Sequence, residues 1–400
     1  MWWDLHHRKS TLARRAAQTL PGEPITFAPQ RTSRAAMGRY LTLDDATTLA
    51  AIESDPEGFL AADARDWTVI DEVQRVPALM IAVKRAVDAD RRPGRFLLTG
   101  STNVMTIPHI SESLAGRVEI LDLWPLAQCE IENTSARFLS WAFSDEPAVR
   151  TGAETRGLVV ERALKGGYPD AFARSSRSRR NAWFGSYLAT VIQREIKTIS
   201  NIDDEAAIVR TLRALASRSG GPRNIEALAG DVATPASTVR RYVELLKLTF
   251  LISELPPWSG GLDARIVRSP KMLINDPGLY GHLLNLSPGD SQIGLLIEDF
   301  VGTELSKLIS FEGVGEFTLM HFRTHRQNEV DFVVESGDRR IVGIEAKAAS
   351  TVTNADFRGL HALADAAKGK LHRGIVFYCG DRSVPFGSNM WAVPIGALWS

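Results

Sequence analysis

Two acids and a lysine in the last quarter of the sequence have the types and the spacing of a divalent-metal site for phosphate chemistry. Asp331 lies in the alternating segment 329–334 (EVDFVV), and Glu345 and Lys347 lie two residues apart in the apolar segment 341–347 (IVGIEAK). Residues two apart in a strand share a face, and a hairpin between the two segments brings Asp331 close to Glu345. Two carboxylates can hold Mg²⁺, and the lysine can orient or activate a water that attacks phosphate.

A helix expected over residues 292–309 precedes this hairpin and carries Glu298, a third candidate ligand for the metal. We therefore take Asp331, Glu345 and Lys347 as candidate catalytic residues. The candidate metal ligands are Glu298, Asp331 and Glu345. The alternative is a solvated hairpin that carries an incidental Glu-x-Lys pair. The apolar flanks argue against that alternative, and acids buried among them need a metal ion or another cation as a partner.

A second acidic pair ends an apolar run in the first part of the chain, WTVIDE at residues 67–72. Ligands of open α/β sheets bind at the carboxyl ends of the strands. From such a position Asp71 can hold Mg²⁺ through water, and Glu72 can act catalytically by polarising the water that attacks a phosphate. The alternative is a strand that simply ends in a solvated acidic turn.

Small polar residues follow the next apolar run, FLLTGSTN at residues 96–103. Ser101 and Asn103 are candidates for contacting the γ-phosphate of a bound nucleotide. Arg117, in SLAGR at residues 113–117, is a candidate for an arginine that reaches a phosphate in the same or a neighbouring subunit. The alternative for Arg117 is an ordinary surface charge at a helix end.

A phosphate loop of the form G-x-x-x-x-G-K-[ST] wraps phosphates closely with backbone N–H groups at a helix N-terminus. The segment that approaches this pattern is WDLHHRKS at residues 3–10, where Lys9 and Ser10 are present but Trp3 and Arg8 replace the two glycines. Side chains at those positions obstruct the tight turn and the close approach to phosphate. Lys9 and Ser10 are candidate ATP-binding residues; the alternative is a coincidental helix start.

The composition is that of a globular protein, with 44% apolar and 24% charged residues and a formal net charge of zero. Wholesale disorder is therefore excluded, and no run of about 18 apolar residues predicts a membrane span. Two cysteines cannot form a disulfide framework, which favours a cytoplasmic protein. Residues 150–250 carry 17 Lys and Arg but 10 Asp and Glu, a modest basic excess that makes DNA a candidate partner.

The elements that must position these residues alternate between strand and helix in the first part. Short apolar runs, typical of strands buried on both faces, predict strands at 39–43, 67–70, 96–99 and 118–121. Apolar residues at helical spacing predict a helix over 77–88. Further helices are expected over 155–164 and 180–199, and residues 256–291, rich in Pro and Gly, are expected to form a linker with short elements.

Three helices followed by a strand are expected in the middle of the chain, over residues 204–217, 225–231, 236–248 and 250–255. That is the order of a helix-turn-helix with a wing. The residues early on the third helix, where a recognition helix contacts DNA, are Ser237, Thr238, Arg240 and Arg241. The alternative is a packing module that links the first part of the chain to its tail.

Several motifs occur in a fixed order: RYLTLDD (39–45), WTVIDEVQRVP (67–77), FLLTGSTN (96–103), SLAGR (113–117), LWPL (123–126), GGYP (166–169), and later IEDFVGTEL, EVDFVVE, IEAKAAS, PFG and WAVP. This set resembles a family of prokaryotic AAA-type P-loop ATPases with a C-terminal domain of unknown function. The resemblance covers about residues 39–400. Through Asp331, Glu345 and Lys347 the tail also resembles the PD-(D/E)xK nuclease core.

The resemblance implies an α/β protein that begins with a parallel-sheet P-loop NTPase core at residues 1–125, N-terminally incomplete here. A helical lid and winged-helix-like region follows at 150–255, then the linker at 256–291 and a PD-(D/E)xK-like α/β domain at 292–400. The resemblance also implies ATP and Mg²⁺ as cofactors, ATP hydrolysis, action on nucleic acid, and a homo-oligomer as one state of assembly. The alternative is a non-catalytic interaction or DNA-binding protein with a decayed ATP site.

Overall fold

A computed structural model of the chain describes residues 39–62, 67–100, 116–135, 137–145, 154–197, 200, 202, 204–260, 269–312, 315–325 and 328–400. The chain divides into two units, Met1–Leu123 and Trp124–Ser400. The predicted nucleotide contacts at Lys9, Ser10, Ser101 and Asn103 lie outside the described residues. Within the described residues, no helix combines the length and the apolar character needed to cross a membrane.

Three parallel strands in the order β1-β2-β3 form the sheet of unit 1. Its elements are β1 (Arg39–Thr42), α2 (Ala46–Ser54), α3 (Pro56–Ala61), β2 (Thr68–Asp71), the short 3-10 helix η1 (Val73–Arg75), α4 (Leu79–Ala89) and β3 (Phe96–Leu98). Helix α2 begins where the side chain of Asp45 accepts a hydrogen bond from the backbone N–H of Thr48, at 2.7 Å. Three of the four predicted strands and the predicted helix are therefore present.

The prediction of a fourth strand at residues 118–121 is wrong. These residues are irregular, and no strand pairing joins them to any other described segment. The side chains of Ile120 and Leu121 are 55% and 54% exposed. An apolar run becomes a buried strand only where a neighbouring strand and a covering layer are available, and the described part of unit 1 offers neither at this segment.

Helices dominate the first half of unit 2. They are α6 (Gln128–Glu132), α7 (Phe138–Ala142), α8 (Arg156–Lys165), α9 (Pro169–Phe172), α10 (Arg177–Thr190), the π-helix η3 (Val191–Ile196), α12 (Glu205–Ser217), α13 (Ile225–Val232) and α14 (Ala236–Leu248). The helix predicted over 180–199 begins earlier, at Arg177 after its Ser176 cap. From Val191 to Ile196 it continues as the π-helix η3, so the predicted helix consists of two segments. Helices α12, α13 and α14 pack on one another and lead into strand β4 (Ile252–Leu255).

Residues 256–291, predicted as a linker with short elements, include buried parts of unit 2 among the residues that the structure describes. Strand β5 (Lys271–Ile274) pairs antiparallel with β4, and α15 (Pro277–Leu283) follows it. All four residues of β5 are buried. Proline and glycine here mark the turns between buried elements, because the helices on either side cover the intervening apolar residues.

The tail of unit 2 is a six-stranded mixed sheet in the order β10-β11-β9-β8-β7-β6. Its elements are α16 (Ile293–Glu312), β6 (Phe317–Arg323), β7 (Glu329–Ser336), β8 (Ile341–Ala346), η4 (Asn354–Phe357), α17 (Arg358–Ala367), β9 (Leu371–Tyr378), β10 (Val384–Pro385), β11 (Met390–Pro394) and η5 (Ile395–Leu398). Strands β6, β7 and β8 are antiparallel neighbours, and β9 lies parallel to β8.

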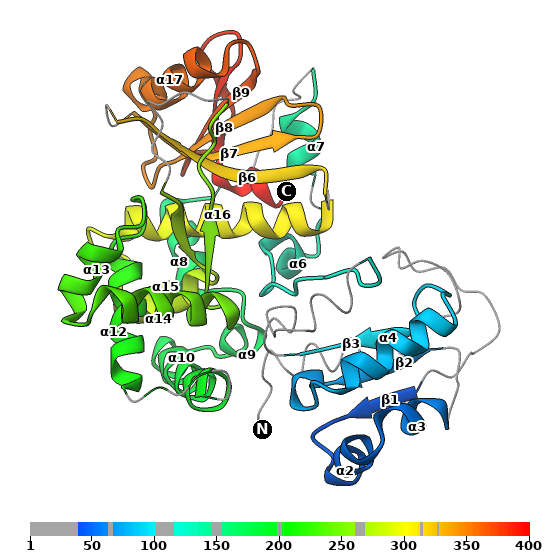
Figure 1. Cartoon of the computed structure of the whole chain (residues 1–400). Coiled ribbons are helices and arrows are strands. Elements are labelled where there is room, and N and C mark those ends of the chain that lie inside the picture. The colour runs from blue at the N-terminus through cyan, green and yellow to red at the C-terminus, as the bar shows by residue number, and fades with distance from the viewer. Residues whose placement is uncertain are drawn as a thin grey trace. The chain divides into compact units, whose positions relative to one another are not determined.

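Helices α16 and α17 cover opposite faces of this sheet (Figure 1). A Cβ atom added to Gly302 of α16 would lie 2.6 Å from the ring of Phe332, and one added to Gly343 of β8 would lie 2.7 Å from Leu360 and Leu363 of α17. Every residue of β8 is buried as a result. The alternation of β7 therefore places Phe332 toward α16 and Val333 toward the opposite face.

A buried ion pair within α16 forms hydrogen bonds to the backbone of the segment that begins unit 2. The side chains of Glu304 and Lys307 are 2% and 1% exposed, and the Lys307 ammonium lies 2.8 Å from a Glu304 oxygen. Glu304 also accepts a hydrogen bond from the backbone N–H of Gln128 (2.8 Å), and Lys307 donates to the carbonyl of Leu126 (3.1 Å). Leu126 in turn donates its N–H to the carbonyl of Gly167. The LWPL, GGYP and IEDFVGTEL motifs therefore meet at one structural contact.

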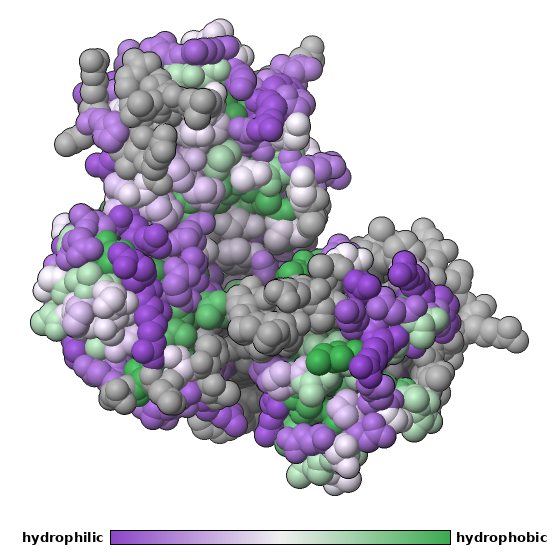
Figure 2. Space-filling model, in the orientation of Figure 1, coloured by the Kyte–Doolittle hydropathy of each residue, from purple (hydrophilic) through white to green (hydrophobic). Residues whose placement is uncertain are grey.

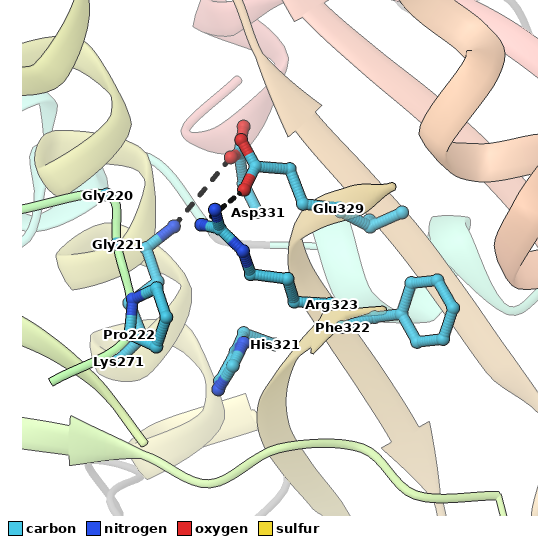
Figure 3. Close-up of a pocket in the computed structure, with 10 residues that line it drawn as sticks. Gly220, Gly221, Pro222, Lys271, His321, Phe322, Arg323, Glu329 and Asp331 are labelled. Atoms are coloured by element: carbon cyan, nitrogen blue, oxygen red, sulfur yellow. Dashed lines mark ion pairs between the residues drawn. The ribbon is translucent and has the colours of Figure 1, made fainter. Parts of the chain in front are cut away.

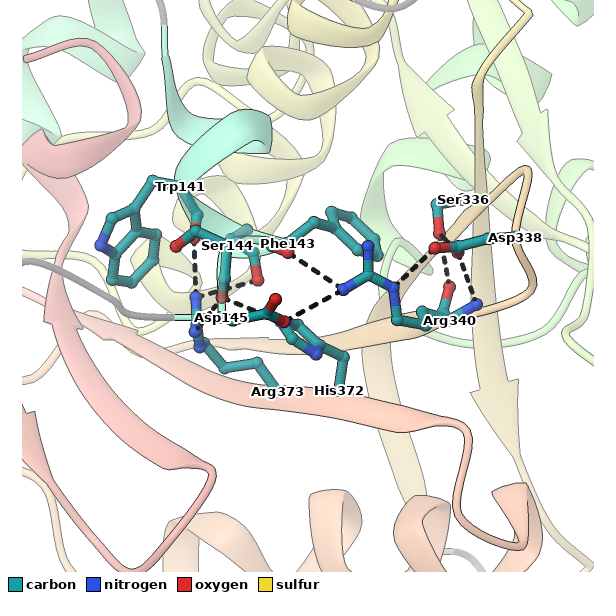
Figure 4. Close-up of polar contacts among 10 residues, drawn as sticks. Trp141, Phe143, Ser144, Asp145, Ser336, Asp338, Arg340, His372 and Arg373 are labelled. Atoms are coloured by element: carbon teal, nitrogen blue, oxygen red, sulfur yellow. Dashed lines mark hydrogen bonds and ion pairs between the residues drawn. The ribbon is translucent and has the colours of Figure 1, made fainter.

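Short helix α7 is attached to strand β9 by an arginine. Arg373 donates hydrogen bonds to the carbonyls of Trp141, Ala142 and Ser144, at 2.7, 2.9 and 2.8 Å (Figure 4). The last carbonyls of a helix have no partner within the helix, and a buried cation satisfies them well. This contact, together with the buried side chains of α7, fixes the short helix against β9.

Candidate functional sites

Strands β7 and β8 bring the predicted tail acids together. Phe332 pairs with Ile344 at the end of the antiparallel register, and Asp331 and Glu345 are the next residues on the two strands. Asp331 accepts a hydrogen bond from the backbone N–H of Ala346 at 2.9 Å, which holds its carboxylate against β8. Both acids are buried. The hairpin geometry expected from the sequence is present.

Lys347 points to the same side as Glu345 and neutralises it. Its ammonium group donates to a Glu345 oxygen at 3.0 Å. Burial, together with the neighbouring Asp331 carboxylate, raises the pKa of Glu345 well above its usual value, and Lys347 opposes this only in part. The pKa of Glu345 is therefore raised even though Lys347 pairs with it.

Lys271, the first residue of β5, is a member of this site that sequence reasoning missed. Its ammonium group forms an ion pair with Glu298 of α16. It also lies 3.7 Å from Asp331, and Figure 3 marks this second ion pair with a dashed line. Its side chain is 4% exposed. Burial alone would lower the pKa of Lys271, but the carboxylates of Glu298 and Asp331 hold it above its ordinary value.

Each of the three predicted metal ligands is thus held by an ammonium group. Lys271 forms ion pairs with Glu298 and Asp331, and Lys347 forms an ion pair with Glu345. In the described part of the chain, no group of three or more His, Cys, Asp and Glu side chains is arranged to hold a metal ion. These residues do not fit a bound divalent ion in the present arrangement, because the cation they require is already supplied by the protein.

A small pocket opens beside Lys271, lined by the turn before α13 and by β6 and β7 (Figure 3). Its cavity volume of about 10 Å³ leaves room for about one water molecule. On its wall Arg323 forms an ion pair with Glu329 at 2.8 Å. His321 bonds through Nε2 to the carbonyl of Ser269, and burial with the nearby Lys271 lowers its pKa to about 4. His321 is therefore a neutral, buried side chain of a strand.

The acidic pair of unit 1 lies at the carboxyl end of its central strand, β2. Asp71 is buried and accepts hydrogen bonds from the hydroxyl of Tyr40 in β1 (2.6 Å) and from that of Thr99, just after β3. The two hydroxyl groups orient the carboxylate at the carboxyl end of β2, where the sequence predicts that it holds Mg²⁺ through water. The residues that are described here fit the predicted Mg²⁺ position.

Glu72 has a backbone conformation that non-glycine residues rarely adopt, with φ of 62°. The turn is held by the N–H of Val73, which donates to the carbonyl of Thr99, and the N–H of Thr99, which donates to Ile70. Such a conformation costs about 1–3 kcal/mol and persists where surrounding contacts impose it, most often at functional sites. The Glu72 carboxylate accepts a hydrogen bond from the side-chain amide of Gln74 at 2.5 Å.

Arg117 is engaged by an acid of its own unit. Its guanidinium donates two hydrogen bonds to Asp88 of α4, at 2.7 and 3.3 Å, and the bonds from Arg117 lower the pKa of Asp88. Both side chains are about one-third exposed, at 30% and 35%. A phosphate would have to compete with Asp88 for this arginine, so the role predicted for Arg117 stays a prediction.

The comparisons with known proteins bear first on the N-terminal region. Residues 9–132 match the AAA domain. This match, together with a match of residues 293–398 to a domain of unknown function (DUF4143), supports an AAA-type ATPase family. Residues 156–290 match another domain of unknown function (DUF8612). The AAA domain match spans Lys9 and Ser10 as well as Asp71 and Glu72, and it supports an ATPase-like function.

Two mycobacterial proteins are similar over most of the chain. They are Uncharacterized protein Mb2031c of Mycobacterium bovis and Uncharacterized protein Rv2008c of Mycobacterium tuberculosis. Each is 29% identical over 331 residues, which are 81% of this chain and 67% of the relative. Their names assign no activity, so the functional argument depends on the AAA domain and on the geometry of the sites.

Proposed function

We propose that this chain is an ATP-binding protein of AAA type that hydrolyses ATP in its N-terminal unit and acts on nucleic acid through its second unit. The observation that carries the ATPase part is the position of Asp71 and Glu72 at the carboxyl end of β2, within a segment that matches the AAA domain. That end of a parallel sheet is where α/β proteins bind nucleotides.

In this proposal Lys9 and Ser10 contact the phosphates, and Ser101 and Asn103 contact the γ-phosphate. Asp71, oriented by Tyr40 and Thr99, holds the water shell of Mg²⁺, and the metal neutralises charge on the phosphates when it is bound. Glu72, which the left-handed turn places directly after β2, polarises the attacking water. Arg117 is the candidate for a phosphate contact within or between subunits.

The Lys9→Ala variant tests nucleotide binding. A hydrogen bond to a charged group is worth about 1.5–3 kcal/mol, so we expect the Kd for a fluorescent ATP analogue to rise about tenfold or more. Lys84→Ala, which removes a lysine of α4, is the matched control and should leave the Kd unchanged. Absence of binding by the unmodified chain, which Lys9→Ala cannot reduce further, would contradict the proposal.

The nucleic-acid part is supported by helix α14 and its surroundings. Ser237, Arg240 and Arg241 are exposed near its start, while its other face is buried against α12 and α13. Hydrophilic side chains predominate over this helical region in Figure 2, with scattered apolar ones. Three packed helices, the antiparallel strands β4 and β5 that follow them, and the basic excess of residues 150–250 favour a winged-helix-like module that contacts phosphates.

The Arg240→Ala variant tests this contact. We expect weaker binding of duplex DNA at every sequence tried, and a salt dependence, measured as log K against log salt, that is shallower by about one. Arg339→Ala removes an exposed arginine of the β7–β8 turn and is the matched control. DNA binding with the same affinity and salt dependence in Arg240→Ala would contradict this assignment, and preference for RNA would change the substrate class.

The second candidate is a non-catalytic interaction protein with a decayed ATP site. It is favoured by Trp3 and Arg8, which occupy the glycine positions of the phosphate loop. For the tail, the succession of α16, three strands, α17 and β9, with Asp331 and Glu345 on neighbouring strands, supports a PD-(D/E)xK-like fold. We propose that the tail uses this fold to bind rather than to cleave.

A further inference from the structure

We propose that the ammonium group of Lys271 fills the cation position of the acidic cluster formed by Glu298, Asp331 and Glu345, so that the C-terminal part of the chain takes no divalent ion. This goes beyond the proposed function, because it assigns a role to a lysine outside the recognised motifs. It does not depend on ATP binding by unit 1.

The first argument is the position of the ammonium group. It forms an ion pair with Glu298 from α16 and lies 3.7 Å from Asp331 of β7, so it bridges the two elements that were predicted to share a metal. The ring of Phe332 lies beneath it, with 5.0 Å between the nitrogen and the ring centroid. Two acids and an aromatic ring are a complete set of partners for a buried cation.

The second argument is that Lys271 cannot leave this position easily. Its backbone belongs to β5, which pairs with β4 on one side, and an isolated bridge joins Lys271 to Pro222. Arg223 donates its N–H to the carbonyl of Pro270, immediately before the lysine. The side chain is 4% exposed, so removing the ammonium from the acids would leave three buried carboxylates with a single lysine, Lys347.

The third argument is space and charge. Mg²⁺ requires near-octahedral oxygen ligands at about 2.0–2.1 Å and keeps several waters. The pocket beside Lys271 has room for about one water molecule. One Asp331 oxygen is already used by the N–H of Ala346. A dication entering beside Lys271 would also face an unscreened like charge, because the site is buried.

The test compares Mn²⁺ binding by the full chain and by Lys271→Ala, using thermal melting and titration calorimetry without nucleotide. The unmodified chain should bind Mn²⁺ no differently from Asp331→Asn, and neither should nick DNA or RNA with Mg²⁺. Lys271→Ala removes the ammonium and leaves room, so we expect a lower melting temperature that Mn²⁺ raises. This rise should disappear in the double variant Lys271→Ala with Asp331→Asn.

Lys307→Ala is the matched control, because Lys307 is a second buried lysine paired with an acid of α16. An equal Mn²⁺ response in Lys307→Ala would show a general effect of losing a buried lysine and would overturn the proposal. Mn²⁺ binding or Mg²⁺-dependent nicking by the unmodified chain that is lost in Asp331→Asn would overturn it as well. If Lys271→Ala does not fold, Lys271→Gln replaces it with the same expected response, and the comparison of the unmodified chain with Asp331→Asn remains decisive.

Discussion

ATP hydrolysis by the full chain is expected to fall about 100-fold or more when Glu72 is replaced by Gln, while ATP binding is retained. The amide keeps the size of the side chain and can still contact Gln74, but it cannot polarise the attacking water as a carboxylate does. The measurement is phosphate release at saturating ATP, together with the Kd of a fluorescent ATP analogue.

Glu53→Gln is the matched control, since Glu53 is an exposed acid of α2 in the same unit. It should leave turnover unchanged. Equal turnover in Glu72→Gln and the unmodified chain would remove Glu72 from the catalytic role. No turnover by the unmodified chain would contradict hydrolysis altogether and favour the interaction protein with a decayed ATP site.

Lys307→Met is expected to lower the free energy of unfolding of unit 2 by about 3–5 kcal/mol, because it leaves the carboxylate of Glu304 buried without its cation. The variant also removes the hydrogen bond to the carbonyl of Leu126, at the point where the motif segments meet. Methionine keeps most of the side-chain volume, so the loss reports the charge and the hydrogen bonds rather than a cavity. Urea denaturation followed by circular dichroism measures it.

Lys247→Met tests whether burial is the cause. Lys247 also pairs with two acids, Glu244 at 3.0 Å and Glu254 at 2.9 Å, but its side chain is 28% exposed. Pairs of that kind contribute about 0–1 kcal/mol. Replacing Glu304 with Gln in the Lys307→Met background should recover part of the loss, since no unpaired charge remains. A loss in Lys307→Met no greater than in Lys247→Met would contradict the prediction.

Apolar periodicity and short apolar runs predicted the elements that carry Asp71, Asp331 and Glu345, but not the short helices α6, α7 and α9 or the strands β9 and β11. Helix α14 and the strands β1, β2 and β3 lie at or within one or two residues of their predicted positions, because α14 has apolar residues at helical spacing and the three strands are short apolar runs. The strand predicted at 118–121 is absent because a strand needs a neighbouring strand to pair with. Its residues have strand character, yet strand formation depends on a neighbour that the local sequence does not describe.

The sequence alone predicted that a hairpin brings Asp331 close to Glu345, because residues two apart in a strand share a face and a short polar turn joins the two segments. It likewise placed Asp71 and Glu72 at the end of β2. Only the tertiary structure decided what neutralises the tail acids. Lys271 begins an unremarkable apolar run, and it reaches Glu298 and Asp331 because β5 packs against α16 and β7. A charge partner supplied by a distant segment leaves no local pattern, and for that reason it had to be found in the folded chain.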